Sequence, residues 1–195
     1  MPEAPTTSVQ MPDEVLVRHA REGDAVAREE LFHRHRSDSY RVAYRQLGNE
    51  QDALDVVQEA MLKAFSALGD FDGRSGFRTW LLKIVTNTAL DWGRRRKRRP
   101  SLPSGESPDQ RPDPAADDPA RRLYQQDLRR ALDQALNRLT PTIRTTFVLY
   151  AEAGMTYKEI AEAQSVPIGT VMSRIHAARA KLQADLDWDR LNGLS

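Results

Sequence analysis

The sequence has 195 residues, of which 39% are apolar and 29% charged, and its formal net charge is +1. This length suits one medium-sized domain or two small ones. The absence of cysteine excludes disulfides, thiolate zinc sites and cysteine nucleophiles. No apolar run approaches the roughly 20 residues that cross a bilayer, and the N-terminus has no secretory signal pattern. We therefore expect a cytoplasmic protein without membrane insertion, with a short disordered lead over residues 1–11.

Helical periodicity dominates the N-terminal half, and strand-like alternation is almost absent. Gly48 and Asn49 form a stop signal between two of the helical segments. A glycine-containing loop over residues 71–76 precedes the last of them. The apolar spacing predicts four helices here, over residues 13–21, 25–47, 52–68 and from about 77 onward.

The composition changes at Pro100, and the segment 100–119 contains six of the eleven prolines, namely Pro100, Pro103, Pro108, Pro112, Pro114 and Pro119. Such a segment has too little apolar content to form a core. Helical periodicity resumes near Arg121 and continues to about Leu186. We predict an all-α protein of two small helical domains, residues 12–99 and 121–186, joined by a Pro-rich flexible linker over 100–120 and followed by a tail over 187–195.

An acidic patch lies in the third predicted helix. Asp52, Asp55 and Glu59 are spaced by three and four residues, so they share one helix face, and Gln58 lies beside them. This pattern is compatible with a solvated acidic face or with a docking surface for a basic partner.

The next helix is basic along one flank and ends in six successive cations, Arg94 to Arg99. Lys83, Asn87 and Arg94 occupy that flank, opposite an aromatic stripe that contains Trp80. Cations beside amide and aromatic groups suit neutralisation of phosphates and reading of unstacked bases. The plainer interpretation is a charged helix end, with Trp80 in the core.

The segment from Met155 to Leu182 predicts a helix-turn-helix. Thr156 and Glu159 form a capping-box pattern, and Pro167 suits the first turn of a second helix that buries Val171 and Ile175. This second helix contains no acidic residue through Leu182, which favours insertion into a major groove over an ordinary helical hairpin. The motif indicates DNA binding without defining the process it serves.

Four segments, in this order, resemble the conserved segments of the extracytoplasmic-function sigma factors, a group of the sigma-70 family of bacterial RNA polymerase: DALDVVQEAMLKAF, FDGRSGFRTWLLKIVTNTALD, LTPTIRTTFVLY and MTYKEIAEAQSVPIGTVMSRIHAARAKL. The resemblance covers nearly the whole chain outside the lead, the linker and the last residues. It implies an alternative sigma factor whose first domain is sigma region 2 and whose second is sigma region 4.

The resemblance also implies a role for each region. In region 2, contact with the clamp helices of the largest polymerase subunit falls to Asp52, Asp55, Gln58 and Glu59. Contact with the −10 element falls to Phe71, Arg74, Ser75, Lys83, Asn87, Arg94 and Arg95. Region 4 is implied to bind the polymerase flap and the −35 element, the latter through Thr170, Ser173, Arg174, His176, Arg179 and Lys181. A further implied partner is an anti-sigma factor, and no cofactor, metal or catalytic residue is expected.

This sequence departs from the family pattern at a few positions. Met172 and Ala177 stand where many members have a basic residue, and Leu54 stands where an acidic one is common. Asp91 lies within the basic helix, where it could contact a base amine or orient a neighbouring arginine. The base preference at the −35 element therefore does not follow from the family resemblance.

Three other functions are compatible with parts of the sequence. A helix-turn-helix regulator with an unrelated helical N-terminal domain leaves the basic helix unexplained. A helical nuclease lacks a clustered set of acids or histidines, because His33 and His35 point to different faces of one helix. A sigma mimic that binds a regulator without DNA would be distinguished by promoter binding.

Overall fold

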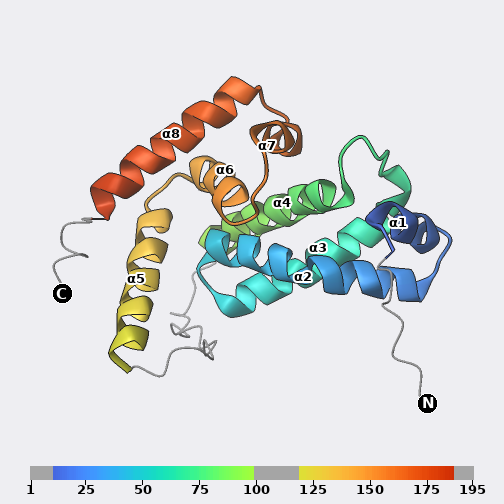
Figure 1. Ribbon diagram of the computed structural model, residues 1–195, viewed down its shortest axis with the longest axis horizontal. Coiled ribbons are helices and arrows are strands. Elements are labelled where there is room, and N and C mark those ends of the chain that lie inside the picture. Colours follow the sequence, from blue (N-terminus) through green and yellow to red (C-terminus); the bar gives the residue numbers. More distant parts are fainter. Residues whose placement is uncertain (1–10, 99–118, 187–195) are drawn as a thin grey trace, which may run out of the picture.

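The computed structural model describes residues 11–98 and 119–186, and every long element within these ranges is an α-helix (Figure 1). The lead, most of the predicted linker and the tail lie outside the described residues. The all-α prediction is confirmed. In chain order the elements are α1 (Asp13–Arg21), α2 (Ala25–Leu47), α3 (Glu50–Ser66), the 3₁₀ turn η1 (Leu68–Asp70), α4 (Phe77–Arg98), α5 (Pro119–Asn137), α6 (Pro141–Ala151), α7 (Tyr157–Gln164) and α8 (Ile168–Asp185).

Short polar residues and glycine define the helix ends in the first region, α1 to α4. The Asp24 carboxylate accepts hydrogen bonds from the first turn of α2, and Gly48 ends this helix in the left-handed conformation, with φ 67°. The Asn49 side chain then accepts from the backbone N–H of Asp52. Because Asn49 caps the helix, α3 begins at Glu50, two residues before the predicted start.

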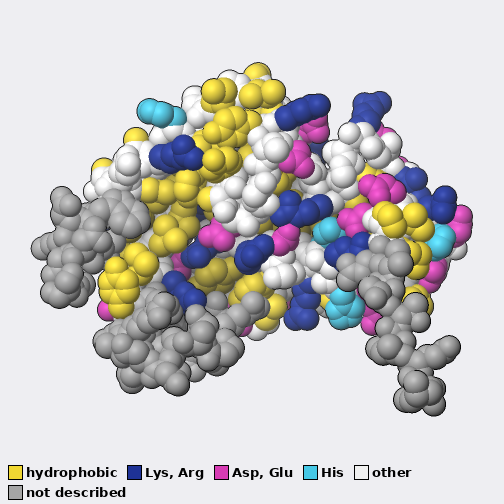
Figure 2. All heavy atoms as spheres, in the orientation of Figure 1, with side chains coloured by type: hydrophobic (Ala, Val, Ile, Leu, Met, Phe, Trp, Pro, Cys, Tyr) yellow, Lys and Arg dark blue, Asp and Glu magenta, His cyan; other side chains and the backbone are white. Residues whose placement is uncertain are grey.

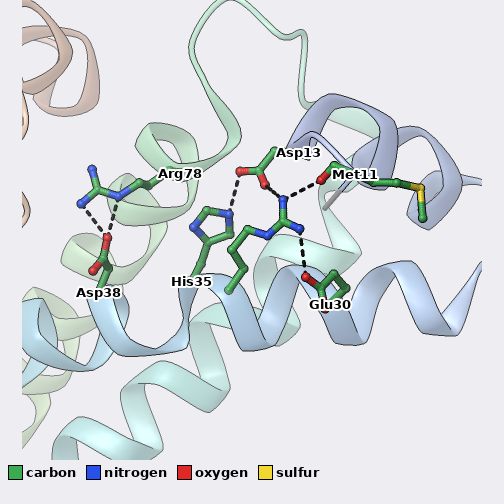
Figure 3. Close-up of polar contacts among 7 residues, drawn as sticks. Met11, Asp13, Glu30, His35, Asp38 and Arg78 are labelled. Carbon is green, nitrogen blue, oxygen red and sulfur yellow. Dashed lines mark hydrogen bonds and ion pairs between the residues drawn. The ribbon is translucent and has the colours of Figure 1, made fainter. Parts of the chain in front are cut away.

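Ion pairs fix α1 and α4 against α2 (Figure 3). The carboxylate of Asp13 lies 2.7 Å from Nε2 of the buried His35 and accepts from Nη1 of Arg34 at 2.8 Å. Further along α2, Asp38 accepts from Nε of Arg78 at 2.6 Å. Burial raises the pKa of Asp38, but hydrogen bonding and charge from Arg78 outweigh burial and hold this pKa below its ordinary value. His35 is therefore part of the packing between helices.

The second region, α5 to α8, contains the predicted helix-turn-helix. Thr156 and Glu159 cap α7 reciprocally, as a capping box should. Ser165, with φ 54°, makes the turn, and Pro167 precedes the first residue of α8 instead of occupying its first turn. Facing inward along α8 are the buried side chains of Val171, Ile175, Ala178 and Leu182.

The two regions pack directly against each other, a contact that the sequence did not predict. Helices α6 and α7 lie against α2 and α4 (Figure 1). One hydrophobic cluster extends from the core of α1–α4 to Val148, Met155 and Ile160 of α6, the following loop and α7. A smaller cluster joins α5, α6 and α8 around Leu136 and Leu182. The two helical regions therefore share a core.

Polar contacts cross the same boundary. Arg45 of α2 lies between two carboxylates of the second region, donating to Glu152 at 2.9 Å and to Asp133 at 2.5 Å. Burial lowers the pKa of Arg45, but the two carboxylates outweigh burial and raise it. On α4, the Thr79 hydroxyl donates to the Glu159 carboxylate at 3.1 Å. The boundary is therefore charged at its edge and apolar at its centre.

Candidate nucleic-acid and polymerase interfaces

The acidic residues of α3 do not form one uniform face. Asp52 forms an ion pair with Arg96 of α4, and Glu59 pairs with Lys63 at 2.6 Å and with Arg95 at 3.3 Å. The hydrogen bond from Lys63 is the main reason that the pKa of Glu59 lies below its ordinary value. Asp55 instead lies beside the exposed amide of Gln51. Two of the predicted docking carboxylates are thus shared with the basic helix.

An outer face of α3 remains open, and it is partly apolar. It consists of Gln51, Leu54, Asp55, Gln58 and Leu62, which follow one another at helical spacing. Leu54 and Leu62 are 37% and 64% exposed, whereas Ala53, Val56, Val57, Ala60, Met61 and Ala64 of the same helix are buried. Leu62 was not predicted as part of this face, although its position four residues after Gln58 places it there. The outer face combines a carboxylate, two amides and two leucines.

The loop before α4 is anchored from both sides. The Phe71 ring is only 7% exposed and packs against Trp80 with ring centroids 5.2 Å apart. Arg21 of α1 donates to the carbonyls of Leu68 and Phe71. Phe71 therefore holds the loop in place, and the more exposed part of the loop is Asp72 to Gly76.

A surface hollow of about 310 Å³ lies between this loop and α1. Its lining includes the predicted residues Arg74 and Ser75, and also Arg18 and Arg21 of α1, which the sequence analysis did not single out. Nothing in the spacing of α1 links it to a loop 50 residues away. The lining is mixed in charge, because Glu14 and Asp72 accompany the three arginines, and Asp72 pairs with Arg74 at 3.0 Å.

Asn87 lies apart from this hollow. It is exposed and sits ten residues after Phe77, roughly 15 Å along the helix axis. Beyond it, Asp91 accepts a hydrogen bond from Nη1 of Arg94 at 3.2 Å, and both side chains are exposed. A second hollow, of about 350 Å³, adjoins this part of α4 and is lined by Glu59, Lys63, Asp91, Arg94 and Arg95. Lys83, one turn before Asn87, is half-buried.

On α8, the predicted polar readers and cations differ in their surroundings. Ser173 and His176 are exposed and Thr170 is half-buried. The cations each hydrogen-bond to a neutral acceptor on the same region: Arg174 to the Gln164 side-chain oxygen at 3.0 Å, Arg179 to the Tyr150 hydroxyl at 3.1 Å, and Lys181 to the Arg138 carbonyl at 2.8 Å. The outer surface of α8 is therefore open, with its cations folded back at the sides.

Neither a metal site nor a membrane span is found in residues 11–98 and 119–186. No three His, Cys, Asp or Glu side chains converge there as metal ligands would. Among the helices of the same ranges, none has the combined length and apolar character needed to cross a bilayer.

Two family models match the chain, in the order that the fold displays. Residues 31–99 match sigma-70 region 2, and residues 129–182 match sigma-70 region 4. The first match covers most of α2 together with α3 and α4, and the second covers the second half of α5 together with α6, α7 and most of α8.

Whole-chain relatives agree with these matches. The RNA polymerase sigma-H factor of Pseudomonas aeruginosa is 33% identical over 183 residues, covering 91% of this chain and 95% of that protein. The ECF RNA polymerase sigma-E factor of Escherichia coli K12 is 32% identical and covers 88% and 93% of the two chains.

Two solved structures are similar in fold. The structure of CnrH in complex with the cytosolic domain of CnrY superposes with a TM-score of 0.68 at 34% identity, covering 91% of this chain and 98% of that chain. The sigma factor RpoE of Bartonella quintana, solved with the anti-sigma factor NepR, gives a TM-score of 0.59 at 22% identity. It covers 89% of this chain and 93% of that chain.

Proposed function

Since the chain belongs to the extracytoplasmic-function sigma factors of the sigma-70 family, we propose that it binds core RNA polymerase, recognises −35 and −10 promoter elements and initiates promoter-specific transcription. The observation that carries this proposal is the presence, on one chain, of a region 2 fold with a basic helix and a region 4 fold with an exposed helix-turn-helix. A duplex-binding regulator needs only the second of these.

Run-off transcription with purified core polymerase tests the proposal directly. The template is a promoter selected by genome-wide binding of this protein, and a second template carries scrambled −35 and −10 elements. We expect a transcript of defined start only when protein, core polymerase and intact promoter are combined. Binding of the promoter without any transcript would instead support the helix-turn-helix regulator.

The outer face of α3 is the proposed contact with the polymerase clamp. Asp55 is the one carboxylate of this face, and it has no ion pair among the described residues. Asp55→Lys places like charge against a basic partner, which costs several kcal/mol at an interface. We expect at least a tenfold loss of core binding in a co-purification assay, with an unchanged helical circular dichroism spectrum. Glu22→Lys, at the exposed end of α1, is the matched control and should bind core normally.

Asn87 is the proposed reader of an unpaired base in the −10 element. Its amide offers both a donor and an acceptor, which suits the Watson–Crick edge of a base only when that base is unpaired. Asn87→Ala should leave duplex binding unchanged and reduce promoter opening in permanganate footprinting. On a pre-melted template, where no opening is needed, transcription by the variant should be partly restored. Equal failure of duplex binding would contradict this assignment.

Regulation and location follow from the same proposal. Because CnrH was solved with the cytosolic domain of CnrY, a protein regulator of that kind is a reasonable partner for this chain. A factor that binds polymerase acts in the cytoplasm and contributes recognition without catalysis of its own. A pull-down with a candidate regulator encoded beside this protein tests whether such a regulator binds this chain.

A further inference from the structure

The N-terminal half of α8 is apolar on its open side. Ile168 and Met172 are 46% and 53% exposed, and His176 continues the same row at intervals of four residues. Figure 2 shows hydrophobic side chains gathered over this end of α8. The row lies away from Val171 and Ile175, which anchor the helix in the core. Burial of α8 against its own region therefore leaves these two large side chains partly in water.

The cations of the helix do not cover this row. Arg174 is half-buried and bonded to Gln164, and Arg179 lies against Tyr150 with its guanidinium 5.3 Å from the ring centroid. An exposed Ile or Met cannot neutralise phosphate, and it offers no hydrogen bond to guanine. Apolar side chains do have one specific partner in the major groove, the 5-methyl group of thymine.

The first residues of a recognition helix are the ones that reach base edges. We propose that Ile168 and Met172 read the 5-methyl groups of thymines in the −35 element, so that this factor prefers A·T pairs where α8 enters the groove. The inference rests on the proposed function of α8 as the −35 reader, and it identifies the chemistry of the recognised groups. Ser173 and His176 are the polar readers beside this row.

Deoxyuridine isolates the methyl group, because it pairs like thymidine and lacks only the 5-methyl. The holoenzyme is assembled from the full-length chain and core polymerase. Its affinity is measured on the selected promoter, with each −35 thymine replaced in turn by deoxyuridine. Removing one methyl from an apolar contact should weaken binding about three- to fivefold at the contacted positions. The other positions should be unaffected.

Alanine substitutions of the two apolar side chains test the same contacts from the protein side. Met172→Ala and Ile168→Ala should each weaken binding on thymidine by a similar factor and abolish the methyl effect at one position. Both side chains are exposed, so neither change should alter folding. Val26→Ala is the matched control: Val26 is 74% exposed on α2, and its loss should leave every methyl effect intact.

The outcomes separate this inference from the proposed function. If a scrambled −35 element binds as well as the intact one, both fail. If the −35 element matters but deoxyuridine has no effect, or has the same effect in wild type and in both variants, only the methyl assignment is overturned. A −35 element without A·T pairs contradicts it as well. Unchanged DNA binding by both variants, with loss of regulator binding, would assign the row to a protein partner.

Discussion

The cations of region 2 and those of region 4 are held by different kinds of group. In region 2, Arg95 and Arg96 of α4 pair with the carboxylates of Glu59 and Asp52 on α3. In region 4, Arg174 and Arg179 of α8 hydrogen-bond to an amide oxygen and to a phenol. The family resemblance implies a DNA contact for Arg95, Arg174 and Arg179 alike, without distinguishing their surroundings.

This difference decides how readily each set can turn to a phosphate. When an arginine moves from a carboxylate to DNA, the carboxylate loses its charged partner. When an arginine moves from a neutral oxygen to DNA, no unpaired charge remains on the protein. The arginines of α8 should therefore reach DNA at a lower cost than those of α4. In region 2, carboxylates of α3 that are expected to contact polymerase pair with arginines of α4 that are expected to contact DNA. Binding of polymerase should therefore change the charge of the DNA-binding surface, and binding of DNA should change the charge of the polymerase-binding surface.

The largest expected effect concerns the cation shared between the regions. Arg45→Met removes the partner of both Glu152 and Asp133 at a mostly buried site. We expect the free energy of unfolding to fall by roughly 2 kcal/mol, somewhat less than for a fully buried pair. Urea denaturation followed by circular dichroism measures it. Arg41→Met breaks an exposed pair with Asp38 and should cost less than about 1 kcal/mol. Equal effects would show that Arg45 is no more than a surface ion pair.

Gln164→Glu would make region 4 resemble region 2. The change gives Arg174 a carboxylate in place of an amide oxygen, so its release to DNA becomes more costly. We expect holoenzyme affinity for the −35 element to fall about three- to tenfold, measured by fluorescence anisotropy. In an Arg174→Ala background the same change should have a much smaller effect, because the new carboxylate then has no Arg174 to hold. The double-mutant cycle also subtracts any direct repulsion between the new carboxylate and the DNA phosphates. An undiminished effect in that background would contradict the expectation.

Glu59→Gln would make region 2 resemble region 4. Lys63 and Arg95 lose a charged partner and become available to phosphates. The slope of log affinity against log salt concentration should steepen by up to about one for non-specific DNA. Glu50→Gln changes the same charge at the start of α3, and no ion pair of Glu50 occurs in the described part of the chain. It is therefore the control, and a matching slope for both variants would refute the comparison.

The smallest expected effect is in the pH dependence of the same pair. The pKa of Glu59 is lower in the folded state, so its contribution to stability is complete above the unfolded pKa, about 4, and disappears as the pH falls through the folded value. The difference in unfolding free energy between wild type and Glu59→Gln should therefore be present at pH 7, begin to decrease near pH 4 and disappear as the pH falls through the lower pKa of the folded state. Denaturation at a series of pH values measures it. A difference that persists at low pH would mean that packing, not charge, connects Glu59 to α4.

The sequence predicted the helices well, because local signals determine them. The capping box at Thr156 and Glu159 and the stop at Gly48 are each readable within a few residues, and the structure confirms them. It missed the start of α3 by two residues because it did not assign Asn49 as a cap. Local sequence is sufficient to predict a helix cap or a helix stop, because all of the interacting groups lie within a few residues of one another.

The contacts between distant segments could not be predicted in this way. Arg45 and Glu152 are 107 residues apart, and no periodicity links them. The partners of Asp52 and Glu59 on α4 were equally invisible, since an acidic face and a basic helix can each exist alone. The residues proposed for polymerase and DNA binding remain predictions, but the structure divides them into those that are open and those that are already paired.

The shared hydrophobic cluster also has a consequence for cooperativity. Val148 and Ile160 of the second region are fully buried in the same hydrophobic cluster as the core of the first, so we expect that neither region can unfold without exposing apolar surface of the other. Calorimetry should therefore show one transition whose van't Hoff and calorimetric enthalpies agree, in place of two separate melting events. Amide exchange in α4 should likewise report the opening of α7, because the two helices pack against each other.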